Sequence, residues 1–299
     1  MKNTPLTRRD FVKNSALAAA AFQLPPALGA VAAGAAGPAA GAGDRPVELR
    51  WLDGQAPAVL PGTTWGVPWE RGRLPKDAAF ALRTPAGEAV PVQSWPLATW
   101  PDGSLKWSGH AIGPGAEGAE RLLIAPGNPA APASPMVVRE TPEAITVDTG
   151  VITCRVARSG PDVIASLARA GVEIARSGRL VCLRQDRTGA AQGILRQETF
   201  TGMISSAVVE QSGPVRAVVR LEGKHAREGG RAWLPFTLRL YFYTGGDAVS
   251  MLHTFVFDGE KSEDFISGMG IRFEVPLREE LHNRHVRFAG KDGGMWGES

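Results

Sequence analysis

V-P-V-Q-S-W-P-L-A-T-W-P-D-G-S-L-K-W, residues 90–107, predicts a β-hairpin. Pro101 fixes φ near the value that the second position of a type I or type II turn requires. Gly103 tolerates the positive φ that follows Asp102. A tight turn between two strands rich in large apolar residues is therefore expected, and another surface must pack against those residues.

Because side chains alternate along a strand, Leu105 and Trp107 are expected on one face of the second strand, opposite Lys106. Two roles are open for the tryptophans of this region. Indole faces complement the C–H faces of sugar rings, which makes Trp100 and Trp107, together with Tyr243, candidate substrate-binding residues. Large residues also fill the interior of a small barrel, and packing is the favoured role. The tryptophans concerned are Trp65, Trp69, Trp95, Trp100 and Trp107.

Composition and alternation predict an all-β fold. The 299 residues include 36 glycines and 23 prolines, and apolar and polar positions alternate in segments such as 215–221 and 271–275. The Pro- and Ala-rich segment 129–136 supports neither helix nor strand ladder, so it is predicted to be a linker. We expect a small N-terminal β-barrel over residues 43–128 and an antiparallel β-sandwich over residues 137–299.

The first 42 residues predict a twin-arginine signal peptide. Thr7, Arg8, Arg9, Phe11 and Lys13 match the S/T-R-R-x-F-x-K export motif, and an alanine-rich apolar stretch follows. The alternative, a membrane helix, is disfavoured by two prolines and several glycines in that stretch. The sequence therefore predicts export by the twin-arginine pathway to the periplasm or the medium, with no membrane attachment after cleavage.

Charge excludes two classes of partner. Without the four basic residues and the one acidic residue of positions 1–42, the 33 basic and 30 acidic residues of the chain become 29 of each. A neutral mature chain is a poor ligand for nucleic acid or an anionic membrane, because both require a positive surface.

Several segments resemble the exo-rhamnogalacturonan lyase-like (YetA-like) family. The hairpin region carries G-V-P-W-E-R-G-R-L (66–74) and A-T-W-P-D-G-S-L-K-W (98–107), and later segments include E-Q-S-G-P-V-R-A-V-V-R-L-E-G (210–223) and L-P-F-T-L-R-L-Y-F-Y (234–243). A-I-T-V-D-T-G (144–150) and L-H-T-F-V-F-D-G (252–259) extend the resemblance, which covers roughly 45–295. It implies an N-terminal barrel domain followed by a central β-sandwich.

The resemblance also implies a function. Family members act on rhamnogalacturonan or a related acidic polysaccharide by β-elimination, and larger members carry an α/α toroid after these two domains. Since the sequence stops at Ser299, we expect the non-catalytic front of such a lyase, with polysaccharide or a downstream catalytic domain as partner. The alternative is a stand-alone carbohydrate-binding or scaffold module, and whether the chain is an enzyme stays open.

Strand 236–243 carries the candidate chemistry. Its alternation leaves Arg239, Tyr241 and Tyr243 on the face opposite the apolar residues, and His253 follows on the next predicted strand. Elimination beside a uronate needs a cation for the carboxylate, a base and an acid, so Arg239, Tyr241 and His253 are the catalytic candidates. The side of the sheet that His253 faces depends on pairing register. The favoured alternative is an interdomain surface of packed rings and solvated polar tips.

Other motifs predict no metal and no cofactor. The acidic run 258–264 lacks EF-hand spacing and is interpreted as a solvated turn, while His282 and His285 lack a third ligand. Residues 113–118 match G-x-G-x-x-G without a following helix, so a dinucleotide site is not expected. Cys154 and Cys182 lie in apolar strand-like contexts, and two buried free thiols are favoured over a disulfide.

Overall fold

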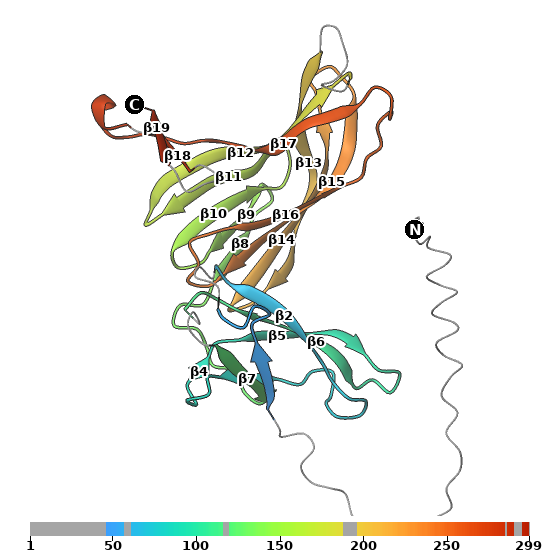
Figure 1. Cartoon of the computed structure of the whole chain (residues 1–299), viewed down its shortest axis with the longest axis vertical. Helices are drawn as coiled ribbons and strands as arrows, with labels where there is room; N and C mark the ends of the chain where they lie inside the picture. Colours follow the sequence, from blue (N-terminus) through green and yellow to red (C-terminus); the bar gives the residue numbers. More distant parts are fainter. Residues whose placement is uncertain are drawn as a thin grey trace, which may run out of the picture. The chain divides into compact units, whose positions relative to one another are not determined.

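The computed structural model describes residues 46–56, 61–115, 120–187, 196–284, 286–289 and 295–298. Its regular elements are β-strands, together with one short 3₁₀ helix, η1 (Leu281–Asn283) (Figure 1). The all-β prediction is confirmed. The predicted signal peptide lies outside the described residues and stays a prediction. Among the residues that the structure describes, no helix is long and apolar enough to cross a membrane.

The N-terminal strands form two antiparallel sheets around one core. The four-stranded sheet has the order β1 (Val47–Arg50), β7 (Arg121–Pro126), β3 (Phe80–Arg83), β4 (Ala89–Val90). The three-stranded sheet has the order β2 (Thr63–Pro68), β6 (Leu105–Ile112), β5 (Gln93–Thr99). Both sheets contribute to one buried cluster that includes Trp69, Phe80, Leu82, Leu105 and Ile124, which gives the predicted small barrel its interior.

The predicted hairpin is strands β5 and β6. The Gly103 N–H donates to the Trp100 carbonyl at 2.9 Å, and Gly103 has φ +83°, as the turn requires. The predicted alternation is wrong in one respect. Thr99 pairs with Leu105 and Ala98 with Trp107, which leaves Lys106 as an extra residue in β6. This bulge reverses which side faces inward, so Leu105 is buried and Trp107 is 40% exposed.

The C-terminal strands form an antiparallel sheet that folds into two layers. They are β8 (Val137–Glu140), β9 (Ala144–Asp148), β10 (Ile152–Ala157), β11 (Asp162–Arg169), β12 (Val172–Gln185), β13 (Gln197–Ser212), β14 (Arg216–Ala226), β15 (Ala232–Tyr243), β16 (Ser250–Phe255) and β17 (Phe265–Glu274). Farther along the chain, β18 (Val286–Ala289) pairs with β19 (Met295–Glu298).

Strand β12 joins the two layers. Its first part, residues 172–179, pairs with β11, its last part, residues 181–185, pairs with β13, and β17 pairs along its other edge. Ser177 has φ +49°, and a Cβ at Gly178 would lie 2.4 Å from the Phe273 ring. The strand therefore changes layer at a point where a positive φ and a close ring contact are both accommodated.

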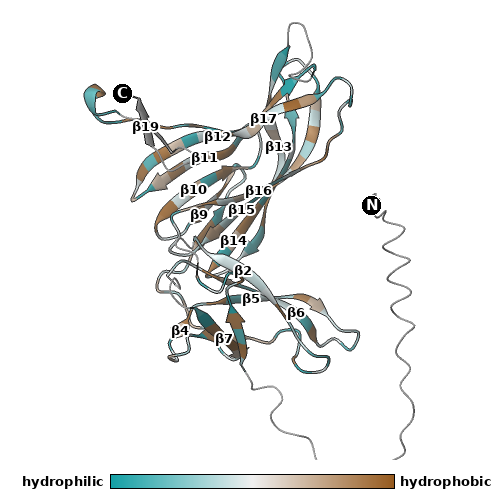
Figure 2. Cartoon of the chain, viewed as in Figure 1, coloured by the Kyte–Doolittle hydropathy of each residue, from teal (hydrophilic) through white to brown (hydrophobic). Residues whose placement is uncertain are grey.

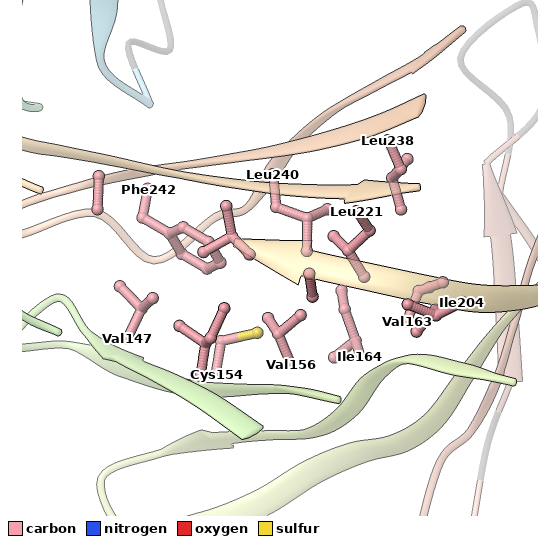
Figure 3. Packing of buried hydrophobic residues seen from close by; sticks show 14 of the residues in the cluster. Val147, Cys154, Val156, Val163, Ile164, Ile204, Leu221, Leu238, Leu240 and Phe242 are labelled. Carbon is pink, nitrogen blue, oxygen red and sulfur yellow. The ribbon is translucent and has the colours of Figure 1, made fainter. Parts of the chain in front are cut away.

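The sandwich core lies between the layers. In Figure 3, residues of β9 to β11 (Val147, Cys154, Val156, Val163, Ile164) face residues of β13 to β15 (Ile204, Leu221, Leu238, Leu240, Phe242). Alternation of hydrophilic and hydrophobic residues along these strands is visible in Figure 2. The period-two pattern of the sequence therefore identifies the core face of each strand.

Two further hairpins have positive φ angles in their turns. Ala170 and Gly171, with φ +49° and +76°, turn β11 into β12, and Gly245, with φ +71°, lies in the turn between β15 and β16. The segment 129–136 contains no strand, although Ala130 forms a bridge to Pro91 and Met136 packs into the sandwich core.

Candidate functional site

The outer face of strands β14 and β15 gathers most of the polar groups that the sequence singled out. Phe236, Leu238, Leu240 and Phe242 point into the sandwich core, so Arg239 and Tyr241 point to the opposite side. The register pairs Arg220 with Arg239 and Val218 with Tyr241. Alternation alone thus identified this face of β15. Pairing with β14 places Arg216 and Arg220 on the same side of the sheet.

Arg216, the first residue of β14, lies at the end of this face next to the barrel. Its guanidinium carbon lies 5.0 Å from the centroid of the Trp95 ring and 5.0 Å from that of Tyr241. The residue is 9% exposed, and its Nε atom has no hydrogen-bond partner. No carboxylate of the described residues lies within ion-pair distance of it, and burial lowers the pKa of Arg216. It is a buried cation held by aromatic rings.

The neighbouring arginines are already paired. Arg239 donates two hydrogen bonds to the Glu210 carboxylate, at 2.7 and 3.0 Å, and Arg220 forms an ion pair with Glu222. The hydrogen bonds from Arg239 hold the pKa of Glu210 below its usual value. Glu210 and Glu222 therefore pair with Arg239 and Arg220. Glu210 also attracts Arg216, but only from beyond ion-pair distance.

The barrel supplies the other part of the site. Gln93 Oε1 accepts hydrogen bonds from the backbone N–H groups of Val215, at 3.1 Å, and Arg216, at 2.7 Å. A Cβ at Gly213 would lie 2.4 Å from the Gln93 amide, so this position requires glycine. Gln93 and Trp95 thus join β5 of the barrel to the start of β14.

Tyr243 lies at the same junction but is closed off. It is 6% exposed, its hydroxyl is 3.0 Å from Thr64 Oγ1, and its ring occupies the space that a Cβ of Gly62 would need. The structure thus places this substrate-binding candidate inside the contact between barrel and sandwich, where its hydroxyl already has a partner.

His253 does not join Arg239 and Tyr241. It pairs with Leu238 across β15 and β16, which puts it on the core side of the sheet. Its ring lies 5.7 Å from that of Phe236 and 5.6 Å from that of His225. Burial, with a smaller effect of His225, lowers the pKa of His253. The three catalytic candidates are therefore divided between opposite faces of one sheet.

Most of these tryptophans are packed against other residues, which was the role favoured from the sequence. Trp69 is 3% exposed and donates through Nε1 to Ser108 Oγ at 2.7 Å, while Trp100 Nε1 donates to the Trp69 carbonyl at 3.0 Å. The Lys106 ammonium lies 4.5 Å from the centroid of the Trp100 ring. Trp107 is the exception, because the Lys106 bulge leaves it half exposed.

The acidic run 258–264 is the exposed turn that was expected, except at Asp264, which is buried. The Asp264 side chain is fully buried and accepts hydrogen bonds from Arg184, at 2.6 Å, and Arg231, at 2.6 Å. Asp258 accepts the backbone N–H of Leu234, which has φ +47°. Within the described ranges, no group of three or more His, Cys, Asp or Glu side chains is arranged to hold a metal ion.

The remaining motif residues lie apart from this face. His282 is exposed in η1, and His285 lies outside the described residues. Cys154 is in the sandwich core and Cys182 in a separate buried cluster, both as free thiols whose pKa burial raises, to about 12 and about 11. The turn at Gly113 and Gly115 borders a groove of about 1010 Å³. Among the described residues that line the groove there is no aromatic side chain and no histidine, so the Arg216 face is the better candidate for recognition.

Sequence reasoning missed Arg216, Gln93 and Glu210. Alternation placed Arg216 and Arg220 on the polar face of their strand, but only the register and the barrel contact show which arginine is unpaired. Gln93 was part of the quoted hairpin, where nothing distinguished its amide from that of a solvated residue.

Comparison with protein families matches residues 45–127 to the PcRGLX-like N-terminal RIFT barrel domain and residues 136–299 to the PcRGLX-like protein central beta sandwich domain. The chain belongs to the PcRGLX-like family. The resemblance stated from the hairpin and strand motifs is confirmed, and this rhamnogalacturonan lyase-like family is carbohydrate-active. The "Uncharacterized protein YetA" of Bacillus subtilis (strain 168) is 41% identical over 248 residues, which are 82% of this chain and 29% of YetA. The chain therefore spans less than a third of the length of that relative.

Proposed function

We propose that this chain is the barrel and sandwich part of an exported, rhamnogalacturonan lyase-like protein, and that it binds acidic polysaccharide without completing the elimination reaction. Arg216 carries the proposal, because a buried, unpaired guanidinium beside two aromatic rings suits an acidic sugar. Export by the twin-arginine pathway is proposed from the motif at Arg8 and Arg9.

The arrangement of acid and base groups supports binding over catalysis. Elimination beside a uronate needs a base within reach of the proton and a cation that neutralises the carboxylate, on the same side of the substrate. Tyr241 contacts Arg216 on the outer face, whereas His253 is on the core side, and Glu210 is held by Arg239. A second wall from another domain would be needed to enclose a substrate and exclude water.

The proposed protein partner is a downstream catalytic domain. Strand β16 is at the edge of its sheet, and the segment 251–257 exposes five large apolar side chains. They are Met251, Leu252, Phe255, Val256 and Phe257. No charged residue lies between Val249 and Phe257, so the edge lacks the charges that usually prevent strand pairing.

Retention on polysaccharide tests the proposal. Native electrophoresis of residues 43–299 through gels containing rhamnogalacturonan or neutral galactan should show retardation by the acidic polymer only. Parallel incubation with rhamnogalacturonan should give little rise in near-ultraviolet absorbance, because the unsaturated uronate product is not formed. Turnover that Tyr241→Phe abolishes would contradict the proposal and make the outer face catalytic.

A scaffold function without carbohydrate binding is the second candidate. The contacts of Gln93 with Val215 and of Thr64 with Tyr243 favour it, because they fix the barrel to the sandwich through buried polar groups. Equal migration in the acidic, neutral and polymer-free gels would support this candidate and contradict polysaccharide binding.

A further inference from the structure

The outer face of the sandwich contains one buried positive charge more than it contains partners. Arg216, Arg220 and Arg239 share the face with Glu210 and Glu222, and the two carboxylates are engaged by Arg220 and Arg239. A buried charge is normally paired with an opposite charge, because desolvation is otherwise uncompensated. The Trp95 and Tyr241 rings compensate part of that cost by cation–π attraction. They supply no acceptor for the guanidinium N–H groups.

Apart from the Glu210 carboxylate, which acts on Arg216 from beyond ion-pair distance, the groups near Arg216 include further donors. Because Gln93 Oε1 accepts two backbone N–H groups, the amide nitrogen of Gln93 remains as a donor. The Tyr241 hydroxyl can donate as well. With both rings against the guanidinium, its N–H edge is the part left for a ligand, and a carboxylate matches two parallel N–H groups of such an edge.

We propose that Arg216 is a recognition site for one carboxylate of a hexuronate, assisted by the Gln93 amide and the Tyr241 hydroxyl. At Arg216 the face offers a single surplus positive charge, since Lys224 on the same face is eight positions farther along β14 and exposed. Glu210 and Glu222 border the site, so it favours a monoanion over a doubly charged sulfate or phosphate. The choice of a sugar as the source of the carboxylate rests on the proposed function, and an acidic peptide is the competing source.

The first test uses the unaltered protein. Tryptophan indole signals of residues 43–299 are followed by NMR during titration with galacturonate, and the Trp95 signal is assigned with Trp95→Phe. Galacturonate should shift the Trp95 signal, whereas neutral galactose should leave it in place. Equal shifts with galacturonate, acetate and sulfate would overturn the proposal, since any small anion would then bind. Tighter binding of an aspartate-containing peptide would overturn it in favour of a protein partner.

Variants give the second test. Arg216→Gln should weaken galacturonate binding at least about tenfold, because charge-assisted hydrogen bonds are lost. Arg216→Lys retains the charge without the planar fork and should lose most of that affinity too. Arg272→Gln, a change of an exposed arginine on β17, is the matched control and should bind as the unaltered protein does. Circular dichroism verifies folding of each variant. If Arg216→Gln does not fold, galacturonate binding by Arg216→Lys and the titration of the unaltered protein test the proposal.

These results separate the inference from the proposed function. If Arg216→Gln is folded and still retarded in rhamnogalacturonan gels with unchanged galacturonate affinity, the Arg216 site is wrong and polysaccharide binding stands. If the unaltered protein binds galacturonate but is not retarded by the polymer, the uronate site stands and the polysaccharide function is wrong.

Discussion

Acid should destabilise the barrel through His110. This side chain is fully buried, with Nδ1 2.8 Å from Ser94 Oγ and Nε2 2.6 Å from Ser108 Oγ. The rings of Trp65 and Phe80 contact the imidazole, at centroid distances of 5.7 and 5.0 Å. Burial lowers the pKa of His110 from 6.5 to about 4, because no nearby charge compensates the loss of water around the imidazolium.

The direction of the pH effect on stability follows from comparing proton uptake by the folded and the unfolded chain. Above pH 6.5 His110 is neutral in both states, so it adds no pH dependence. As pH falls from 6.5 towards about 4, the unfolded chain takes up a proton that the folded chain does not, and stability decreases. The loss is about 2 kcal/mol at pH 5 and about 3 kcal/mol once both states are protonated, at about 1.36 kcal/mol per pKa unit.

Urea unfolding of the unaltered protein and His110→Gln, at pH 8 and pH 5, measures this contribution. At pH 8 the variant should be less stable by about 1–3 kcal/mol, because hydrogen bonds in the core are perturbed. At pH 5 the difference should shrink by about 2 kcal/mol, since glutamine does not titrate. His225 and His253, whose pKa values burial also lowers, are present in both proteins and cancel. The control is His282→Gln, a change of an exposed histidine. If the difference in free energy of unfolding between His110→Gln and the unaltered protein is equal at both pH values, the reasoning is refuted.

Three further outcomes are expected. Asp264→Asn should reduce the free energy of unfolding by about 3–5 kcal/mol, because it leaves two arginines without their buried carboxylate; a loss below about 1 kcal/mol in urea titration would contradict this. Trp107→Ala should cost about 1–2 kcal/mol, since the ring is 40% exposed, whereas Trp69→Ala should cost about 3–5 kcal/mol; equal melting temperatures of the two variants would be the wrong result. Changing both Arg8 and Arg9 to lysine should leave the precursor in the cytoplasm, and normal periplasmic delivery in cell fractionation would remove the export proposal.

Much of the architecture follows from local pattern, because a strand needs only two-residue alternation and a turn needs only a few special residues. The Pro101 to Gly103 turn and the apolar face of β15 are of this kind, and both occur in the structure as the sequence predicted. The family assignment was also within reach of the sequence, because its motifs lie on these same strands and turns.

Tertiary structure decided everything that depends on register and on contacts distant in sequence. The bulge at Lys106 reversed the inward face of β6, and pairing of His253 with Leu238 separated it from Arg239. Arg216 became the centre of the candidate site only because β5 places Trp95 against it, 121 positions away in the sequence. One-dimensional periodicity identifies which face a side chain occupies, but the charge balance of a face depends on which strands and loops cover it.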